Sequence, residues 1–245
     1  MRVKLVLEYD GTEYCGWQIQ PNGVTVQQRV QEAVFALTGE AVSVIASGRT
    51  DSGVHAAGQT AHFDTVSSIP PERFAAALNS VLPADIRALS SGAAPEGFHA
   101  RFCAKKKTYC YKMYVSETIR PLWNRYAYRI PFSPDITAMK RAARLFEGEH
   151  DFRAFMASGS EVKDTVRTVY SSEITCEGDF IFFTVCGNGF LYNMVRIMAG
   201  TLLEAGAGEM TEADIIAALE KGERTLCGKT LPPHGLTLLS VEYDV

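Results

Sequence analysis

Two strand-like segments, residues 42–46 and 58–63, flank a polar loop with the sequence Ser47-Gly48-Arg49-Thr50-Asp51-Ser52-Gly53-Val54-His55-Ala56. A loop between rigid strands suits a reactive group, because the strands set its position while its glycines allow unusual backbone angles. Asp51 could act there as a nucleophile or general base, with a cationic neighbour for its ionised form. The alternative is a tight turn in which Asp51 accepts backbone hydrogen bonds, and spacing alone favours that turn.

Regular patterns extend outward from this loop in both directions. Alternating apolar residues at 3, 5, 7 and 9 predict an opening strand with one buried face. Helices are predicted after Thr25, closing at Gly39, after Pro70-Pro71, after Ser133-Pro134, closing at Gly148, and after Thr211. A longer apolar helix is predicted at about 190–205. Further strands are predicted near 86–90, 98–104, 107–115, 125–130, 165–175, 179–186 and 236–243.

Strands in neighbouring hairpins mixed with packed helices predict an α+β fold with largely antiparallel sheet. The order strand, helix, strands occurs in both halves of the chain. This repetition predicts two related mixed α/β lobes, residues 1–105, which carry the Asp51 loop, and residues 106–245. A chain of 245 residues buries enough surface to fold without a disulfide or metal staple.

Several classes of protein and site are excluded by composition and spacing. The longest stretch without a charge, Phe180 to Val195, is shorter than the ~20 residues that a membrane helix needs, and no apolar signal segment opens the chain. We therefore expect a cytoplasmic protein without a membrane partner. The six cysteines form no C-x-x-C and the five histidines no H-E-x-x-H, so no metal site is expected.

Motifs for nucleotide binding and serine hydrolysis are incomplete or absent. Gly187-Asn188-Gly189 opens a helix, but Tyr192 stands where a dinucleotide-binding loop needs its third glycine. Cys227-Gly228-Lys229-Thr230 lacks the upstream glycine of a phosphate-binding loop, because Glu223 holds that position. No G-x-S-x-G elbow is present.

Positive charge is concentrated in one segment of an otherwise acidic chain. The net charge is −4, but residues 101–129 hold one acid, Glu117, and the following basic residues: Arg101, Lys105, Lys106, Lys107, Lys112, Arg120, Arg125 and Arg129. Five tyrosines are interleaved with them, and this combination is typical of a surface that binds phosphates and stacks unpaired bases. The alternative is a pair of solvated strand faces.

At the Asp51 loop the chain resembles a known family. Residues Gly48 to Ala56 resemble the nine-residue signature of the tRNA pseudouridine synthase A family. Similar blocks follow in order along nearly the whole chain: Tyr9-Asp10-Gly11-Thr12, Gly16-Trp17-Gln18, Phe98-His99-Ala100-Arg101, Lys107-Thr108-Tyr109-Cys110-Tyr111 and Gly189-Phe190-Leu191-Tyr192-Asn193-Met194-Val195-Arg196. The resemblance implies the pseudouridine synthase fold, with two lobes around a basic central cleft, and a homodimer that binds tRNA.

The resemblance also implies a reaction and a set of residue roles. The reaction is isomerisation of uridine to pseudouridine in the anticodon stem-loop of tRNA, around positions 38 to 40, without a cofactor. Asp51 would be the catalytic nucleophile, Arg49 would help displace the target base, and Tyr109 would lie against the uracil. Arg196 would pair with Asp51 from the second lobe. Arg101 and the three lysines at 105–107 are the candidates for the RNA backbone.

Alternatives remain open for the function and for individual residues. The same scaffold could be a catalytically idle RNA-binding protein or folding helper. It could also be an aspartate-dependent nucleoside or glycoside hydrolase, although hydrolysis usually needs two carboxylates and the loop has one. Arg196 could be purely structural. Tyr109 and Tyr111 share a strand face, so at least one should be core, and His55 and His62 are expected to make local hydrogen bonds.

Overall fold

In the computed structural model, which describes residues 1–159 and 162–244, the chain forms two units. Unit 1 contains Met1–Lys105 and Thr237–Val245, and unit 2 contains Lys106–Leu236. The sequence-based division placed residues 106–245 together. The structure differs for the last residues, because strand β10 (Leu236–Tyr243) pairs in parallel with β3 (His55–Asp64) of unit 1.

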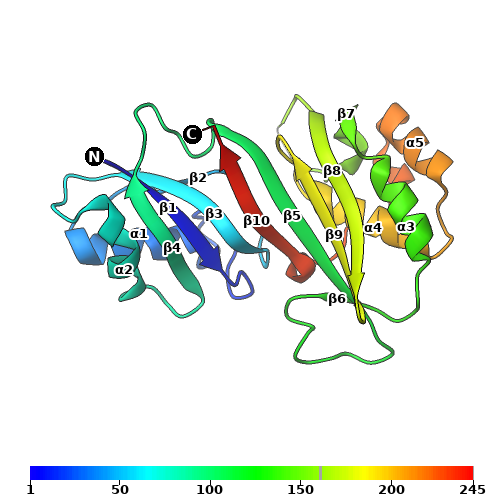
Figure 1. Cartoon of the computed structure of the whole chain (residues 1–245), viewed down its shortest axis with the longest axis horizontal. Helices are drawn as coiled ribbons and strands as arrows, with labels where there is room; N and C mark the ends of the chain where they lie inside the picture. Colours follow the sequence, from blue (N-terminus) through cyan, green and yellow to red (C-terminus); the bar gives the residue numbers. More distant parts are fainter. Residues whose placement is uncertain (160–161, 245) are drawn as a thin grey trace. The chain divides into compact units, whose positions relative to one another are not determined.

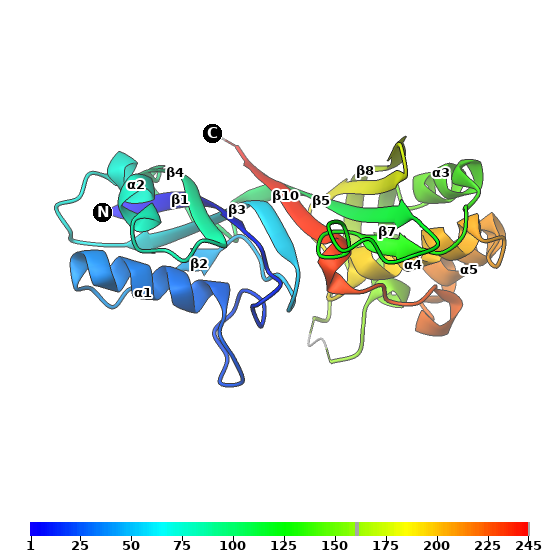
Figure 2. The same ribbon diagram turned by 90° about the horizontal axis from the view of Figure 1, so that it is seen from below.

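Unit 1 is a sheet with two helices. β1 (Arg2–Tyr9) pairs antiparallel with β3 on one side and with β4 (Ile86–Ala93) on the other, and the short β2 (Ile45–Ala46) pairs with β3. Figure 2 shows α1 (Val26–Thr38) running along one face of these strands, and α2 (Phe74–Asn79) follows the 3-10 turn η1 (Pro71–Arg73). Alternate residues of β1 are buried, as the alternating apolar residues at 3, 5, 7 and 9 predict.

The ends of α1 follow from local chemistry. The Thr25 side chain accepts the Gln28 N–H, and the helix ends at Gly39, whose φ of 72° suits a residue without a Cβ atom. The Gln28 side chain donates to Glu32, one turn further along the helix. The buried stripe that packs the helix on unit 1 consists of Val26, Val30, Ala33 and Val34.

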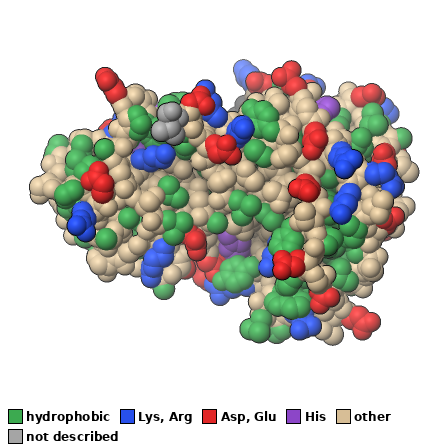
Figure 3. All heavy atoms as spheres, in the orientation of Figure 1, with side chains coloured by type: hydrophobic (Ala, Val, Ile, Leu, Met, Phe, Trp, Pro, Cys, Tyr) green, Lys and Arg blue, Asp and Glu red, His purple; other side chains and the backbone are tan. Residues whose placement is uncertain are grey.

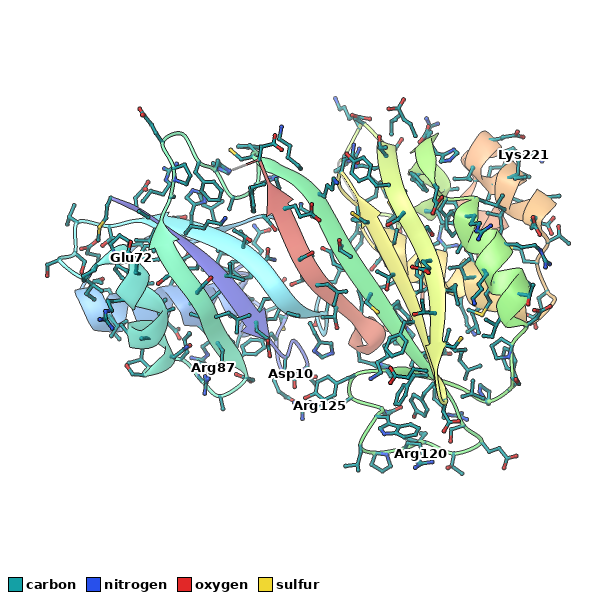
Figure 4. The ribbon with its side chains drawn as sticks, viewed as in Figure 1. Asp10, Glu72, Arg87, Arg120, Arg125 and Lys221 are labelled. Carbon is teal, nitrogen blue, oxygen red and sulfur yellow. The ribbon has the colours of Figure 1, made fainter. Side chains whose placement is uncertain are left out.

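Unit 2 contains mostly antiparallel strands and its own helices (Figure 1). Its strand order is β5 (Ala104–Val115), β9 (Phe180–Gly187), β8 (Val166–Glu177) and β7 (Gly148–Asp151), and β6 (Tyr128–Ile130) pairs in parallel with β5. The helices are α3 (Ile136–Arg144), α4 (Met194–Gly206) and α5 (Glu212–Lys221), with 3-10 turns η2 (Phe152–Phe155), η3 (Arg224–Leu226) and η4 (Pro233–Gly235). The loop between β5 and β6 carries Arg120 and Arg125 (Figure 4).

The predicted α+β class with largely antiparallel strands is confirmed, and two helix ends need correction. α3 ends at Arg144, before Gly148, because the N–H groups of residues 145–147 bond the carbonyls three residues back instead of four, and Gly148 then opens β7. α4 begins at Met194, four residues later than expected, because Asn193 before it has a left-handed φ of 61°.

No helix within residues 1–159 and 162–244 is long and apolar enough to cross a membrane, and none of the His, Cys, Asp and Glu side chains in these ranges form a group of three placed to hold a metal ion. On the face shown in Figure 3, basic and acidic side chains are interspersed.

Candidate active site

The loop that carries Asp51 starts with a buried polar clamp. Ser47 and Gln59 are both fully buried, and the Ser47 hydroxyl donates to the Gln59 side-chain oxygen at 2.6 Å. The Gln59 amide group donates in turn to the Gly48 carbonyl at 3.0 Å. Because Gln59 lies in β3, this clamp fixes the first residues of the loop to a rigid strand.

Thr50 holds the middle of the loop through both its side chain and its backbone. Its hydroxyl lies 2.8 Å from the Tyr9 hydroxyl, and its carbonyl accepts the Trp17 N–H at 3.0 Å. Burial raises the pKa of Tyr9 to about 12, so Tyr9 is a neutral phenol at physiological pH. Gly16 allows the close approach, since a Cβ atom at this residue would lie 2.6 Å from the Thr50 carbonyl oxygen.

Asp51 lies in a tight turn, as its spacing favours. The Asp51 carbonyl accepts the Val54 N–H at 3.1 Å, and Gly53 has a φ of 78°. The Tyr14 carbonyl accepts the Gly53 N–H at 3.3 Å and the Ser52 hydroxyl at 3.1 Å. The turn therefore fixes the backbone of Asp51, which is half-buried, so a tight turn and a positioned carboxylate coexist at this residue.

A second loop, residues 10–17, supports the Asp51 loop, and this contact was missed in the sequence. The Gly11 N–H donates to His55 Nδ1 at 3.1 Å, which confirms the local role expected for His55. A Cβ atom at Gly11 would lie 2.0 Å from the Val54 carbonyl oxygen. Asp10, labelled at the end of β1 in Figure 4, accepts the Thr12 N–H at 3.0 Å and shapes the turn that presents Gly11. The sequence signal for this contact was the presence of Gly11 and Gly16 in the two blocks, residues 9–12 and 16–18, that resemble the family.

The predicted site residues are divided between the units. The structure brings Arg49 and Asp51 together on one loop of unit 1, where Arg49 is exposed and Asp51 half-buried. Tyr109 and Arg196 belong to unit 2. The pairing of Arg196 with Asp51 stays a prediction.

Tyr109 and Tyr111 lie on the same face of β5 in different surroundings. Tyr111 is fully buried, and its hydroxyl donates to the Pro232 carbonyl at 2.8 Å. Burial raises the pKa of Tyr111 well above its ordinary value. Tyr109 keeps 9% of its surface exposed, and its ring packs edge-on against Phe190 with centroids 5.2 Å apart. The prediction that at least one of the pair is core is confirmed by Tyr111.

Arg196 is half-buried in the first turn of α4 and is held by two neighbours. Its Nε donates to the Leu231 carbonyl at 2.7 Å, and its Nη1 donates to Asn193 Oδ1. Among the described residues, Asn193 is the one non-glycine residue with positive φ. Such a backbone persists where its surroundings fix it, and here the Asn193 side chain bonds Arg196 instead of capping the helix. The sequence signal for this role was an asparagine directly before an apolar helical run.

The basic residues expected at the RNA backbone have different neighbours. Lys105 forms an exposed ion pair with Asp244 at 2.9 Å, and Lys106 Nζ lies 5.4 Å from the Tyr170 ring centre. Because successive strand residues point to opposite faces, Lys106 faces away from Lys105 and Lys107 on β5. At most two of these three lysines can therefore contact one RNA backbone from the same face of the strand.

The strand predicted at 98–104 is absent from the structure, except that Ala104 begins β5. Phe98 and Ala100 are buried, which produces the alternating pattern. However, His62 Nδ1 accepts the Ala100 N–H at 3.1 Å, and the Tyr243 hydroxyl donates to the Ala100 carbonyl at 2.7 Å. Side chains, rather than a neighbouring strand, thus satisfy this backbone. The local hydrogen-bonding role expected for His62 is confirmed.

His62 is expected to make the stability of the protein sensitive to mild acid. It is 2% exposed, and burial, together with Arg2 and His99, lowers its pKa to about 4 from an ordinary 6.5, while Asp64 acts in the opposite direction. Between pH 6.5 and 4 the unfolded chain takes up a proton at His62 that the folded protein does not. The free energy of unfolding should therefore fall in this window, by on the order of 1–3 kcal/mol.

Urea unfolding at several pH values measures this effect. His62→Gln, which keeps an acceptor but cannot titrate, should have a weaker pH dependence of unfolding free energy between pH 6.5 and 4 than the wild type. Equal slopes for the two proteins would show that His62 is not responsible.

Comparison with known proteins gives a consistent assignment. A family model described as tRNA pseudouridine synthase matches residues 5–103 and 142–244. The chain is 49% identical to tRNA pseudouridine synthase A of Caldicellulosiruptor bescii, over 98% of this chain and 99% of that protein. It is 45% identical to tRNA pseudouridine synthase A of Bacillus subtilis, over the full length of both. Since the matches span both units, the chain belongs to the tRNA pseudouridine synthase family.

Proposed function

We propose that this protein isomerises uridine to pseudouridine in the anticodon stem-loop of tRNA, around positions 38 to 40, with Asp51 as the nucleophile. Membership of the tRNA pseudouridine synthase family supports the activity. The observation that carries the role of Asp51 is its position in a turn that is fixed at Gly48, Thr50 and Gly53 by neighbouring elements. A carboxylate on such a turn meets a substrate with little loss of conformational entropy.

The chemistry needs few groups. The N-glycosidic bond breaks, the base turns, and the base rejoins the sugar through carbon, so no electrons are exchanged and no nucleotide is consumed. The proposal therefore includes no metal, flavin or ATP. The target uridine must first leave its stack, and the exposed Arg49 on the same loop can take the place of the displaced base.

The proposal also assigns roles to two residues of unit 2, Tyr109 and Arg196. Tyr109, which is nearly buried against Phe190, would form a wall for the uracil. Arg196, whose guanidinium is oriented by Asn193 and Leu231, would provide the cation that an ionised Asp51 needs in a desolvated pocket. We also propose, from the family resemblance, that the protein acts as a homodimer in the cytoplasm, where its tRNA substrate is available.

Analysis of the products separates this function from the two alternatives. Isomerisation leaves the mass of an unmodified tRNA transcript unchanged and replaces uridine by pseudouridine in its nuclease digest. A hydrolase would release free uracil, and an idle RNA-binding protein would produce neither change. We expect pseudouridine without free uracil, whereas free uracil as the main product would overturn the proposal.

The lysines at 105–107 provide a test of how the protein holds RNA. If they contact phosphates, replacing each by glutamine should weaken tRNA binding and flatten its salt dependence, each lost contact lowering the slope by slightly less than one unit. Because Lys106 faces away from Lys105 and Lys107, we expect Lys106→Gln and the Lys105→Gln/Lys107→Gln pair to differ in effect. Unchanged slopes in all of these variants would place the RNA elsewhere on the surface.

A further inference from the structure

Phe102 is an apolar side chain that is exposed to solvent. It belongs to unit 1, in the segment between β4 and β5 where the predicted strand is absent, and 76% of its surface is exposed. A single exposed apolar residue is common on protein surfaces. Phe102 differs from the ordinary case because its backbone and its ring are both fixed.

The backbone around Phe102 is fixed by His99. His99 Nδ1 accepts the Arg101 N–H at 3.2 Å and the Phe102 N–H at 3.3 Å, and the His99 carbonyl accepts the Cys103 N–H at 2.9 Å. Ala100, two residues before Phe102, is bound on its N–H by His62 and on its carbonyl by Tyr243, as described above. The segment therefore presents Phe102 from a preorganised turn.

The ring of Phe102 is oriented by its two neighbours. The His99 imidazole stacks on it with centroids 4.3 Å apart and an interplanar angle of 27°. The Arg101 guanidinium carbon lies 5.7 Å from the ring centre. Stacked aromatic rings beside a guanidinium make up the arrangement that binds an unpaired base together with its phosphate.

The charges near this ring favour a polyanion. Arg101 is exposed next to Phe102, and Lys105 is exposed three residues later. Lys105 forms a surface ion pair with Asp244, an interaction that is weak in water. Lys4 lies over the Phe98 and Tyr243 rings, 5.3 and 4.7 Å from their centres. Cations and aromatic rings, of which Phe102 is the exposed one, thus occur together on unit 1.

We propose that Phe102 is a stacking platform for an unpaired base of the tRNA substrate, with Arg101 on a neighbouring phosphate. The base is distinct from the target uridine, which is assigned to the Asp51 loop. This inference rests on the proposed function, because that function makes RNA the ligand. It adds a positioning residue that holds the substrate rather than reacting with it.

Equilibrium binding of an unmodified tRNA transcript tests the platform. Phe102→Ala should weaken binding by about fivefold or more, and Phe102→Trp should restore it, because stacking needs an aromatic face. Phe102→Leu, which is apolar without a π system, should resemble the alanine variant. The salt slope should stay at the wild-type value in all three, whereas Arg101→Gln should flatten it. Phe35→Ala, at a 56%-exposed phenylalanine on α1, is the matched control and should bind normally.

A set of transcripts, each lacking the base at one position of the anticodon loop, identifies the base that stacks on Phe102. At one position the abasic transcript should bind wild type and Phe102→Ala equally, because the base that stacks is missing. Normal binding by Phe102→Ala, or weakened binding that Phe102→Trp does not restore although the variant unfolds at the wild-type temperature, would overturn the inference. Wild-type pseudouridine formation is scored in the same samples, so failure of the proposed function is recognised separately, by its absence in the wild type.

Discussion

Asp51→Asn is expected to abolish pseudouridine formation while folding and most of the tRNA affinity remain. The amide keeps the size of the carboxylate but loses its charge and nucleophilicity. The hydrogen bonds that shape the loop run through the carbonyls of Gly48, Thr50 and Asp51 and through Gly53, so the turn should survive the substitution. Single-turnover assays on unmodified tRNA, with thermal unfolding of each variant, measure both properties.

Asp179→Asn is the matched control for this substitution. Asp179 is exposed in the turn between β8 and β9, and its backbone carbonyl accepts the Val115 N–H, which the change leaves in place. We expect wild-type turnover from this variant. If Asp51→Asn kept more than about a tenth of wild-type turnover, a loss of less than ~1.4 kcal/mol in barrier, Asp51 would not be the nucleophile.

Tyr109→Phe is expected to bind tRNA almost normally and to turn over much more slowly. Rejoining the base through carbon leaves a proton on that carbon, and a group in the desolvated pocket must accept it. Phenylalanine keeps the ring that packs against Phe190 but removes the hydroxyl. Tyr109→Ala should lose affinity as well, by on the order of 1–3 kcal/mol if the ring stacks on the uracil. Separate measurement of Kd and of single-turnover rate distinguishes these effects.

Tyr111→Phe provides the opposite control two residues along the same strand. It removes the hydroxyl that donates to the Pro232 carbonyl in the core, so it should lower stability by roughly 1–3 kcal/mol while turnover per folded molecule stays normal. A fully active Tyr109→Phe beside an inactive Tyr109→Ala would make Tyr109 a platform only. Normal binding and turnover in both would remove Tyr109 from the site.

Features set by neighbouring residues were predictable from the sequence. The start of α1 after Thr25, its end at Gly39 and the start of α5 after Thr211 all depend on contacts within a few residues. The closing strand was also located, because its extent depends on local alternation. Its partner was not, since parallel pairing with β3 joins Thr237 to His55 across most of the chain.

Features set by distant side chains were not predictable in this way. Phe98 and Ala100 alternate as in a strand, yet the segment is a turn because His62 and Tyr243 bind its backbone. In the site, the motif identified the Asp51 loop, but the support from Gly11 and Gly16 required knowing that residues 10–17 lie against residues 50–55. The role of Asn193 likewise depends on a backbone angle that its sequence does not encode by itself.

Chemical mapping of pseudouridine in an unmodified tRNA transcript, after incubation with the purified protein, tests the central claim most directly. The account predicts new pseudouridine around positions 38 to 40 with wild-type protein, and none with Asp51→Asn at equal tRNA occupancy. Pseudouridine at these positions with both proteins would contradict the role of Asp51, and a transcript left unmodified by the wild type would contradict the proposed function itself.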